Sequence, residues 1–233
     1  MQFLKSLVND TIHLFYPHVC LGCGSDLLQE DNIICLRCIT DLPHTNYAQH
    51  ASNPIEQLFW GRVPLVAAHS EFYFAKESIV QTLIHQLKYR GNQEIGIYLG
   101  TLMAKSLLNS NRFKNIDYLV PIPLFPDKER KRGYNQAAVI CKGMSEVMNV
   151  PVLIGNVNRQ RFTETQTKKH RAERWENVAD SFTIKDKKIM IGKSILLVDD
   201  VITTGATLEA CCQSILEVEQ VKLSLATISS ATR

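Results

Sequence analysis

The sequence predicts an α/β protein built on a parallel β-sheet, with a small cysteine-rich module ahead of it. From residue 64 onward, short apolar runs alternate with segments of helical hydrophobic spacing, which is typical of a parallel sheet covered on both faces. Two Cys-x-x-Cys pairs stand within residues 18–42, a segment with few apolar residues for a core of its own. We therefore expect a large α/β domain over 64–233 and a metal-stabilised module over 18–42.

The composition is ordinary for a globular protein. Of the 233 residues, 45% are hydrophobic and 21% are charged, and the formal net charge of +3 is too small to indicate a nucleic-acid partner by itself. The first 17 residues have the apolar spacing of a short amphipathic helix, but polar residues interrupt it. This pattern predicts neither a secretory signal nor a transmembrane span. We expect a helix over 1–17 that packs on its own protein rather than on a membrane or partner, and a cytoplasmic protein.

The cysteine module has the spacing of a zinc ribbon. Its ligands would be Cys20, Cys23, Cys35 and Cys38. Two such knuckles supply four thiolates in the tetrahedron that structural zinc prefers, and four ligands leave no open position for catalysis. A redox dithiol would need one pair only, and disulfide frameworks are usual in shorter secreted chains. We predict structural Zn²⁺, whose binding supplies most of the folding free energy of the module.

The remaining elements follow in order along the chain. Residues 43–63 are rich in Pro, Asn, Ser and His and predict a linker lying on the larger domain. Hydrophobic spacing then predicts strand 66–74, helices 77–89 and 95–108, strand 118–123, helix 135–148, strand 150–154, helix 168–179, strand 194–198, helix 206–218 and strand 221–228. Parallel sheets place ligands beyond the carboxyl ends of their strands, so the loops after 118–123 and 194–198 are the informative ones.

An apolar strand over 194–198 ends in two adjacent carboxylates, Asp199 and Asp200. Small and hydroxylated residues follow, at the start of a helix: Thr203, Thr204, Gly205, Ala206 and Thr207. Free amides, hydroxyls and a flexible glycine suit a phosphate monoester, while paired carboxylates accept hydrogen bonds from a vicinal diol or hold Mg²⁺ through water. A ribose 5-phosphate unit meets both demands. The alternative, a simple threonine helix cap, explains two acids at the mouth of a buried strand poorly.

A basic segment over 121–136 follows one predicted strand and precedes a helix. It contains Arg130, Lys131 and Arg132, and arginine presents several donors at once to pyrophosphate oxygens. The alternative is a solvated basic turn. We expect contact with pyrophosphate because the segment directly follows a buried strand.

A second basic segment covers residues 159–178, where Arg171 and Arg174 fall at near-helical spacing. A mobile loop of this kind could close over a reacting pyrophosphate and exclude water. The same residues could instead follow a nucleic-acid backbone, with an aromatic side chain as a stacking surface. A merely solvated charged face is the third possibility, and this segment alone does not decide among them.

The run Val-Asp-Asp-Val-Ile-Thr-Thr-Gly-Ala-Thr over 198–207 resembles the signature by which type I phosphoribosyltransferases bind 5-phosphoribosyl-1-pyrophosphate (PRPP). The resemblance implies that Asp199 and Asp200 contact the ribose hydroxyls and that residues 203–207 wrap the 5-phosphate. It also implies Mg²⁺ between the ribose and the pyrophosphate. The fold class expected from it is a type I phosphoribosyltransferase-like domain behind a small N-terminal zinc ribbon.

Over nearly the whole chain, the order of motifs resembles the ComF family. The motifs are Leu-Lys-Tyr-Arg-Gly over 87–91, Pro-Ile-Pro with Arg-Lys-Arg-Gly-Tyr-Asn-Gln over 121–136, and Thr-Gln, Arg and Asn-Val over 165–178. The first of them places Lys88 near the ligand. Membership would imply a role in natural competence, where single-stranded DNA is handled at the inner face of the membrane with other competence proteins.

These patterns leave three functions open. The first is a PRPP-binding protein of the ComF type that acts in DNA uptake by handling single-stranded DNA. The alternative is an active phosphoribosyltransferase of nucleotide metabolism, transferring ribose 5-phosphate from PRPP to a base or amine, with Asp199 and Asp200 as its catalytic residues. No residue identifies an acceptor. A PRPP-sensing transcriptional regulator ranks last, because the sequence has no recognisable helix-turn-helix.

Overall fold

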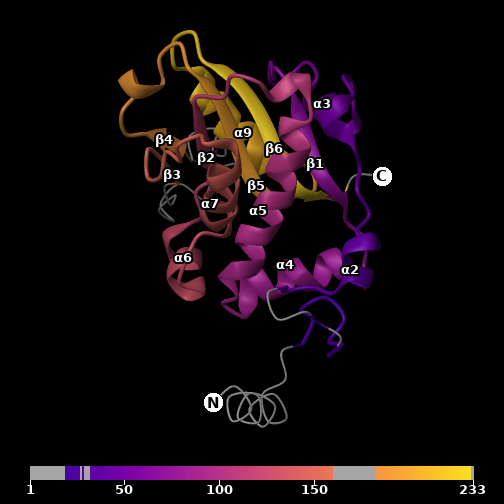
Figure 1. Ribbon diagram of the computed structural model, residues 1–233. Helices are drawn as coiled ribbons and strands as arrows, with labels where there is room; N and C mark the ends of the chain where they lie inside the picture. Colours follow the sequence, from indigo (N-terminus) through magenta and orange to yellow (C-terminus); the bar gives the residue numbers. More distant parts are fainter. Residues whose placement is uncertain (1–18, 27, 29–31, 160–181, 232–233) are drawn as a thin grey trace, which may run out of the picture.

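A four-stranded parallel sheet forms the centre of the protein (Figure 1). The computed structural model describes residues 19–26, 28, 32–159 and 182–231. The sheet has the order β1-β6-β5-β2, with each neighbouring pair parallel, and its strands are β1 (Ala68–Tyr73), β2 (Tyr118–Pro121), β5 (Ser194–Ile202) and β6 (Lys222–Ser230). An antiparallel pair, β3 (Val157–Arg159) and β4 (Phe182–Ile184), forms a second small sheet. The predicted α/β fold class with a parallel sheet is confirmed.

Helices cover both faces of the sheet. The helices are α2 (Leu36–Thr40), α3 (Pro54–Phe59), α4 (Ile79–Tyr89), α5 (Gln93–Leu108), α6 (Pro126–Arg132), α7 (Gln136–Met148) and α9 (Ala206–Leu216), with short 3-10 turns at Tyr47–Gln49, Asn111–Phe113 and Lys188–Met190. Along β5, Leu196 and Val198 pack with α4, α5 and α7, whereas Ile195 and Leu197 pack with α3 and α9. Figure 1 shows α5 and α7 in front of the sheet and α9 behind it. Because β5 is buried on both faces, its sequence reads as a continuous apolar run.

Two glycines bring α5 and α7 into direct backbone contact. A Cβ atom added at Gly100 would overlap the carbonyl oxygen of Ile140, and one added at Gly143 would overlap the carbonyl oxygen of Ile97. Each helix therefore offers a glycine where the backbone of the other helix crosses it. This contact fixes the distance between the two helices that cover the front face.

Both outer edges of the sheet are paired with short segments of backbone. At the β1 edge, the Tyr73 amide donates to the Pro43 carbonyl at 3.0 Å, and the Thr45 amide donates to the Glu71 carbonyl at 3.0 Å. At the β2 edge, the Leu119 amide donates to the Pro151 carbonyl at 3.0 Å, and the Leu153 amide donates to the Leu119 carbonyl at 2.8 Å. The segments that carry these contacts lie outside the regular strands.

Three expectations for individual elements are wrong. Residues 150–154 form an isolated bridge between Leu119 and Val152 rather than a strand. Strand β5 does not stop at 198 but runs through both acidic residues to Ile202, because β6 continues to pair with it as far as Ser230. The basic segment 121–136 is not a loop throughout: it contains helix α6, which begins with Pro126 and ends at Gly133 in the left-handed region, at φ 82°.

Residues 43–63 contain a helix with buried apolar side chains, so they are more than an extended linker. Ile55 and Phe59 of α3 are buried in the cluster shared with α9. Asn53 caps α3 by accepting from the amides of Ile55 and Glu56, and its own amide donates to the Ala68 carbonyl of β1 at 2.8 Å. The boundaries at 42/43 and 63/64 stay a prediction. The helices expected over 1–17 and 168–179 lie outside the described residues.

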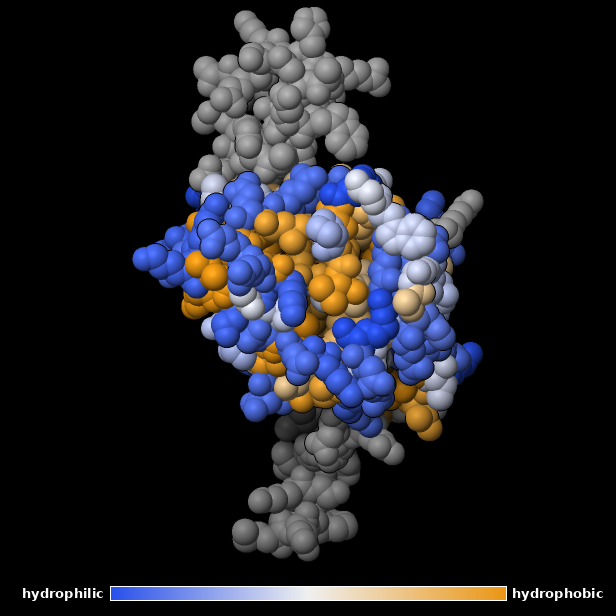
Figure 2. Space-filling view, turned by 90° about the horizontal axis from the view of Figure 1, so that it is seen from above, coloured by the Kyte–Doolittle hydropathy of each residue, from blue (hydrophilic) through white to orange (hydrophobic). Residues whose placement is uncertain are grey.

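The two ends of the sheet differ in polarity. The view from above in Figure 2 faces the end at which the strands begin, and apolar side chains gather there inside a hydrophilic rim. Val66 (57% exposed) and Ile191 (44% exposed) lie in the segments that lead into β1 and β5. The strongly polar pocket described below lies at the other end. None of the described helices combines the length and the apolar character that crossing a bilayer requires.

Candidate functional site

A polar pocket of about 290 Å³ opens at the carboxyl end of β5, between α4, α6 and the start of α9. It brings together most of the residues that the sequence pointed to. Its lining includes Lys88, Arg132, Asp199, Asp200, Thr203, Thr204, Gly205, Ala206 and Thr207. The placement agrees with the rule that parallel sheets bind ligands beyond the carboxyl ends of their strands.

The two acidic residues lie inside β5 and point to opposite faces of the sheet, as successive strand residues do. Asp200, on the α4 face, forms a 2.8 Å ion pair with the Lys88 ammonium, and its backbone amide donates to the Asp199 carboxylate at 2.7 Å. Burial, and then the neighbouring charge of Asp200, raise the pKa of Asp199. The pair therefore combines one carboxylate held by a lysine with one that takes up a proton more readily than a free aspartate.

The loop after β5 presents a helix N-terminus to the pocket. Gly205 is the N-cap residue of α9, at φ 76°, and no side chain caps the helix at this residue. The first amides of α9 are therefore available to an anion. A Cβ atom at Gly205 would lie 3.1 Å from Leu58 Cδ2 and 3.2 Å from Phe59 Cζ. Both the left-handed backbone and the close approach of α3 favour glycine here.

Two further cationic residues, which the sequence analysis does not single out, line the pocket: Lys128 and Arg159. The Arg159 guanidinium lies 3.9 Å from the centre of the Phe125 ring and 5.1 Å from that of Phe182, so it lies within cation–π distance of two aromatic rings. Its Nε is buried and has no hydrogen-bond partner among the residues that the structure describes. Pairing of β3 with β4 places Arg159 opposite Phe182, a long-range contact that no local pattern signals.

Some predicted residues do not line the pocket. Arg130 instead forms a 2.7 Å ion pair with Asp127 one turn earlier on α6, and its side chain is 78% exposed. Lys131 is also exposed on α6. The helical geometry of 126–132 explains this, because it turns only some of the basic side chains toward the pocket. Arg171 and Arg174 lie outside the described residues.

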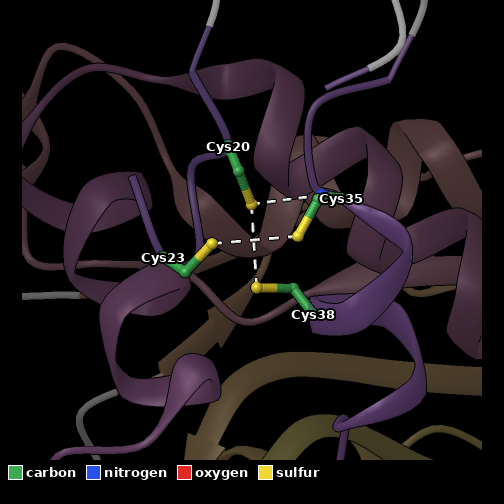
Figure 3. Close-up of side chains that lie close together, drawn as sticks. All are labelled: Cys20, Cys23, Cys35 and Cys38. Atoms are coloured by element: carbon green, nitrogen blue, oxygen red, sulfur yellow. Dashed lines mark hydrogen bonds between the residues drawn. The ribbon is translucent and has the colours of Figure 1, made fainter. Parts of the chain in front are cut away.

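The four cysteines of the N-terminal module form one compact cluster (Figure 3). The Sγ atoms of Cys20 and Cys38 are 3.7 Å apart, those of Cys23 and Cys35 are 3.8 Å apart, and all four lie within 4.8 Å of one another. A zinc tetrahedron with Zn–S bonds of about 2.3 Å has S···S edges of about 3.8 Å. The cluster therefore fits a zinc ion and could hold one.

Backbone amides reinforce this arrangement. The Cys35 amide donates to Cys20 Sγ at 3.1 Å. Burial by itself raises the pKa of Cys20, but the amides of Cys35, Cys23 and Gly22 outweigh it and lower the pKa to about 6. The thiolate, which is the form that binds metal, is thus favoured at this position before any ion is bound.

Comparison with known proteins agrees with this architecture. The phosphoribosyl transferase domain family matches residues 135–232. Competence protein F of Haemophilus influenzae is 27% identical over 202 residues, covering 84% of this chain and 83% of its own length. DNA utilization protein YhgH of Escherichia coli is 28% identical over 206 residues (85% and 84%), and competence protein ComFC of Bacillus subtilis is 28% identical over 233 residues (99% and 90%). With a four-cysteine cluster ahead of a region that matches the phosphoribosyl transferase domain family, the chain is similar over most of its length to these competence and DNA utilization proteins and resembles the ComF family.

Proposed function

We propose that the protein binds PRPP with Mg²⁺ in the pocket at the end of β5 and acts in DNA uptake, in the cytoplasm, by handling single-stranded DNA. One observation carries the proposal: paired carboxylates and an uncapped helix N-terminus line the same pocket. The carboxylates of Asp199 and Asp200 suit the ribose hydroxyls, and residues 203–207 suit the 5-phosphate.

The charge of the pocket supports a polyanionic ligand. Four cationic side chains line it, from Lys88, Lys128, Arg132 and Arg159, against the two carboxylates. Arg132 is held on one side by Gln136, whose Oε1 accepts from its Nη1 at 2.6 Å, and lies 5.5 Å from the centre of the Tyr89 ring. Bound Mg²⁺ would neutralise pyrophosphate charge, and the acidic pair would hold it through water.

The DNA role is supported by the relatives and by the surface around the pocket. The similar proteins are named for competence and for DNA utilization. Helix α6, which borders the pocket, exposes Lys128, Arg130 and Lys131. Basic side chains along a groove are what binding of a nucleic-acid backbone requires. A contribution of Arg171 and Arg174 to the same surface stays a prediction.

Calorimetric titration of PRPP with Mg²⁺ tests the site. The native protein is compared with Asp200→Asn and with Glu217→Gln, a control that removes an exposed carboxylate paired with Lys187. Loss of a charged hydrogen bond costs about 1.5–3 kcal/mol, so Asp200→Asn should weaken binding about 10- to 150-fold while the control binds as the native protein does. Native protein that binds no PRPP would refute the proposal. An affinity of Asp200→Asn equal to that of the native protein would mean that PRPP binds at another site.

A second candidate, an active phosphoribosyltransferase, is favoured by one observation. The raised pKa of Asp199 provides a carboxylate at the pocket that can take up a proton from an acceptor. Release of pyrophosphate that depends on an added base or amine, and that is lost in Asp199→Asn, would support this candidate. If the protein binds PRPP but no tested base or amine causes release of pyrophosphate, the result would support a binding protein without transferase activity.

A further inference from the structure

The cysteine module shares its core with helix α4. Cys20 (1% exposed) and Cys38 (2%) belong to the same buried apolar cluster as Leu83 and Leu87 of α4. The module is therefore not a separate unit attached to the α/β domain. One face of α4 packs against the module and contributes to its buried core.

The first cysteine knuckle contacts α4 near both of the helix ends. In the last turn, Gln86 Nε2 donates to the backbone carbonyl of Leu21 at 2.7 Å. At the helix start, the knuckle lies so close that a Cβ atom added at Gly22 would be 3.3 Å from Ile79 Cγ2 and 3.0 Å from Cys38 Sγ. The backbone between Cys20 and Cys23 is thus held between a ligand sulfur and α4.

The same helix delivers a cation to the pocket. Lys88 follows Gln86 by two residues, which places it on a different side of the helix. Its ammonium lies 2.8 Å from Asp200 Oδ1, with the two side chains only 20% and 11% exposed. The Tyr134 hydroxyl donates to the Leu87 carbonyl between them. The last turn of α4 therefore has the knuckle on one side and the acidic pair on another.

We propose that the metal-loaded cysteine module positions Lys88 and Asp200 through Gln86 and α4, so that metal in the module and PRPP in the pocket stabilise each other's binding. This inference rests on the proposed PRPP site. Four thiolates within 4.8 Å of one another repel unless a cation lies between them, and so small a module depends on its metal to keep its fold. Loss of the metal releases the Leu21 carbonyl from Gln86, and the turn that carries Lys88 loses its support.

Reciprocity gives the inference a readout that does not depend on catalysis. If metal strengthens PRPP binding, PRPP must strengthen metal binding by the same factor. The zinc affinity of the full-length protein can be measured by equilibrium competition with a metal-sensitive chelating dye, with and without PRPP and Mg²⁺. We expect saturating PRPP to raise the zinc affinity about five-fold or more, the lower end of typical coupling between sites.

Gln86→Met tests the connection, because it keeps the length of the side chain and removes the hydrogen bond to Leu21. Gln213→Met, an exposed position on α9, is the matched control. We expect Gln86→Met to bind stoichiometric zinc and to lose most of the effect of PRPP on zinc affinity, while the control retains it. Native zinc affinity that is unchanged by bound PRPP, or an effect of PRPP that persists in full in Gln86→Met, would overturn the inference without affecting the proposed PRPP site. A flat PRPP titration of the native protein would overturn both proposals.

Discussion

Replacement of Gly205 by alanine should be the most informative single change at the pocket. The left-handed backbone of this residue, at φ 76°, costs a non-glycine residue about 1–2 kcal/mol. The new Cβ would also lie 3.1 Å from Leu58 Cδ2 and 3.2 Å from Phe59 Cζ, and overpacking of this kind costs about 1–3 kcal/mol. We expect Gly205→Ala to lose about 2–5 kcal/mol of stability, a fall in Tm of about 4–20 °C for a chain of this size.

A matched glycine separates the two costs. Gly155 also has a left-handed backbone, at φ 72°, but a Cβ atom there would have no neighbour within 4 Å in the described part of the chain. Gly155→Ala should therefore lose only the backbone part, about 1–2 kcal/mol. The assay is thermal unfolding of both zinc-loaded variants by circular dichroism. Equal losses in the two variants would refute the role of α3 as a wall of the phosphate loop. Gly205→Ala should weaken PRPP binding as well, because relief of the contact moves the α9 amides.

Three further outcomes follow from the structure. The Glu71 carboxylate accepts a 2.8 Å hydrogen bond from the His44 ring, and this bond raises the pKa of His44. The stability that this pair contributes is complete below about pH 6.5 and declines as the pH rises through the pKa of His44 in the folded protein. The Tm difference between native protein and His44→Gln should therefore shrink from pH 6 to pH 9. A difference that grows over this range would contradict the role of the pair. Metal analysis should find stoichiometric zinc in native protein and in Cys212→Ala, but not in Cys35→Ser, and equal zinc in all three would contradict the predicted site. Removal of both Arg171 and Arg174 should reduce the slope of log K against log salt for single-stranded DNA by about 1.4; an unchanged slope would exclude them from the DNA contact.

Local sequence patterns were sufficient for the parts of the fold that depend on local chemistry. The alternation of apolar strands and amphipathic helices, the phosphate-loop residues before α9 and the spacing of the four cysteines are each set by neighbours in the chain. The pocket accordingly contains the predicted Asp199 and Asp200, together with Lys88, which the resemblance to a known family placed near the ligand.

The features that the patterns missed depend on contacts between distant residues. The end of β5 is set by its pairing with β6 as far as Ser230. The apolar pattern of β5 itself carries no information about where this partner strand ends. Arg159 reaches the pocket because β3 pairs with β4, which follows it in the sequence only after residues 160–181. The residues of α6 are polar throughout and so favour a loop, whereas the proline at its start and the glycine after its end are typical of a helix.

The backbone contacts at the outer edges of the sheet have a consequence for self-association. An unpaired edge strand is a template on which another chain can add a strand. Residues 43–45 occupy that position on β1, and residues 151–153 occupy it on β2. Because the segment on β1 belongs to the connection from the cysteine module, a truncated chain beginning at residue 64 would expose the β1 edge. We expect such a fragment, which also lacks the buried side chains of α3, to aggregate through this edge, so residues 43–45 protect the sheet from its own copies.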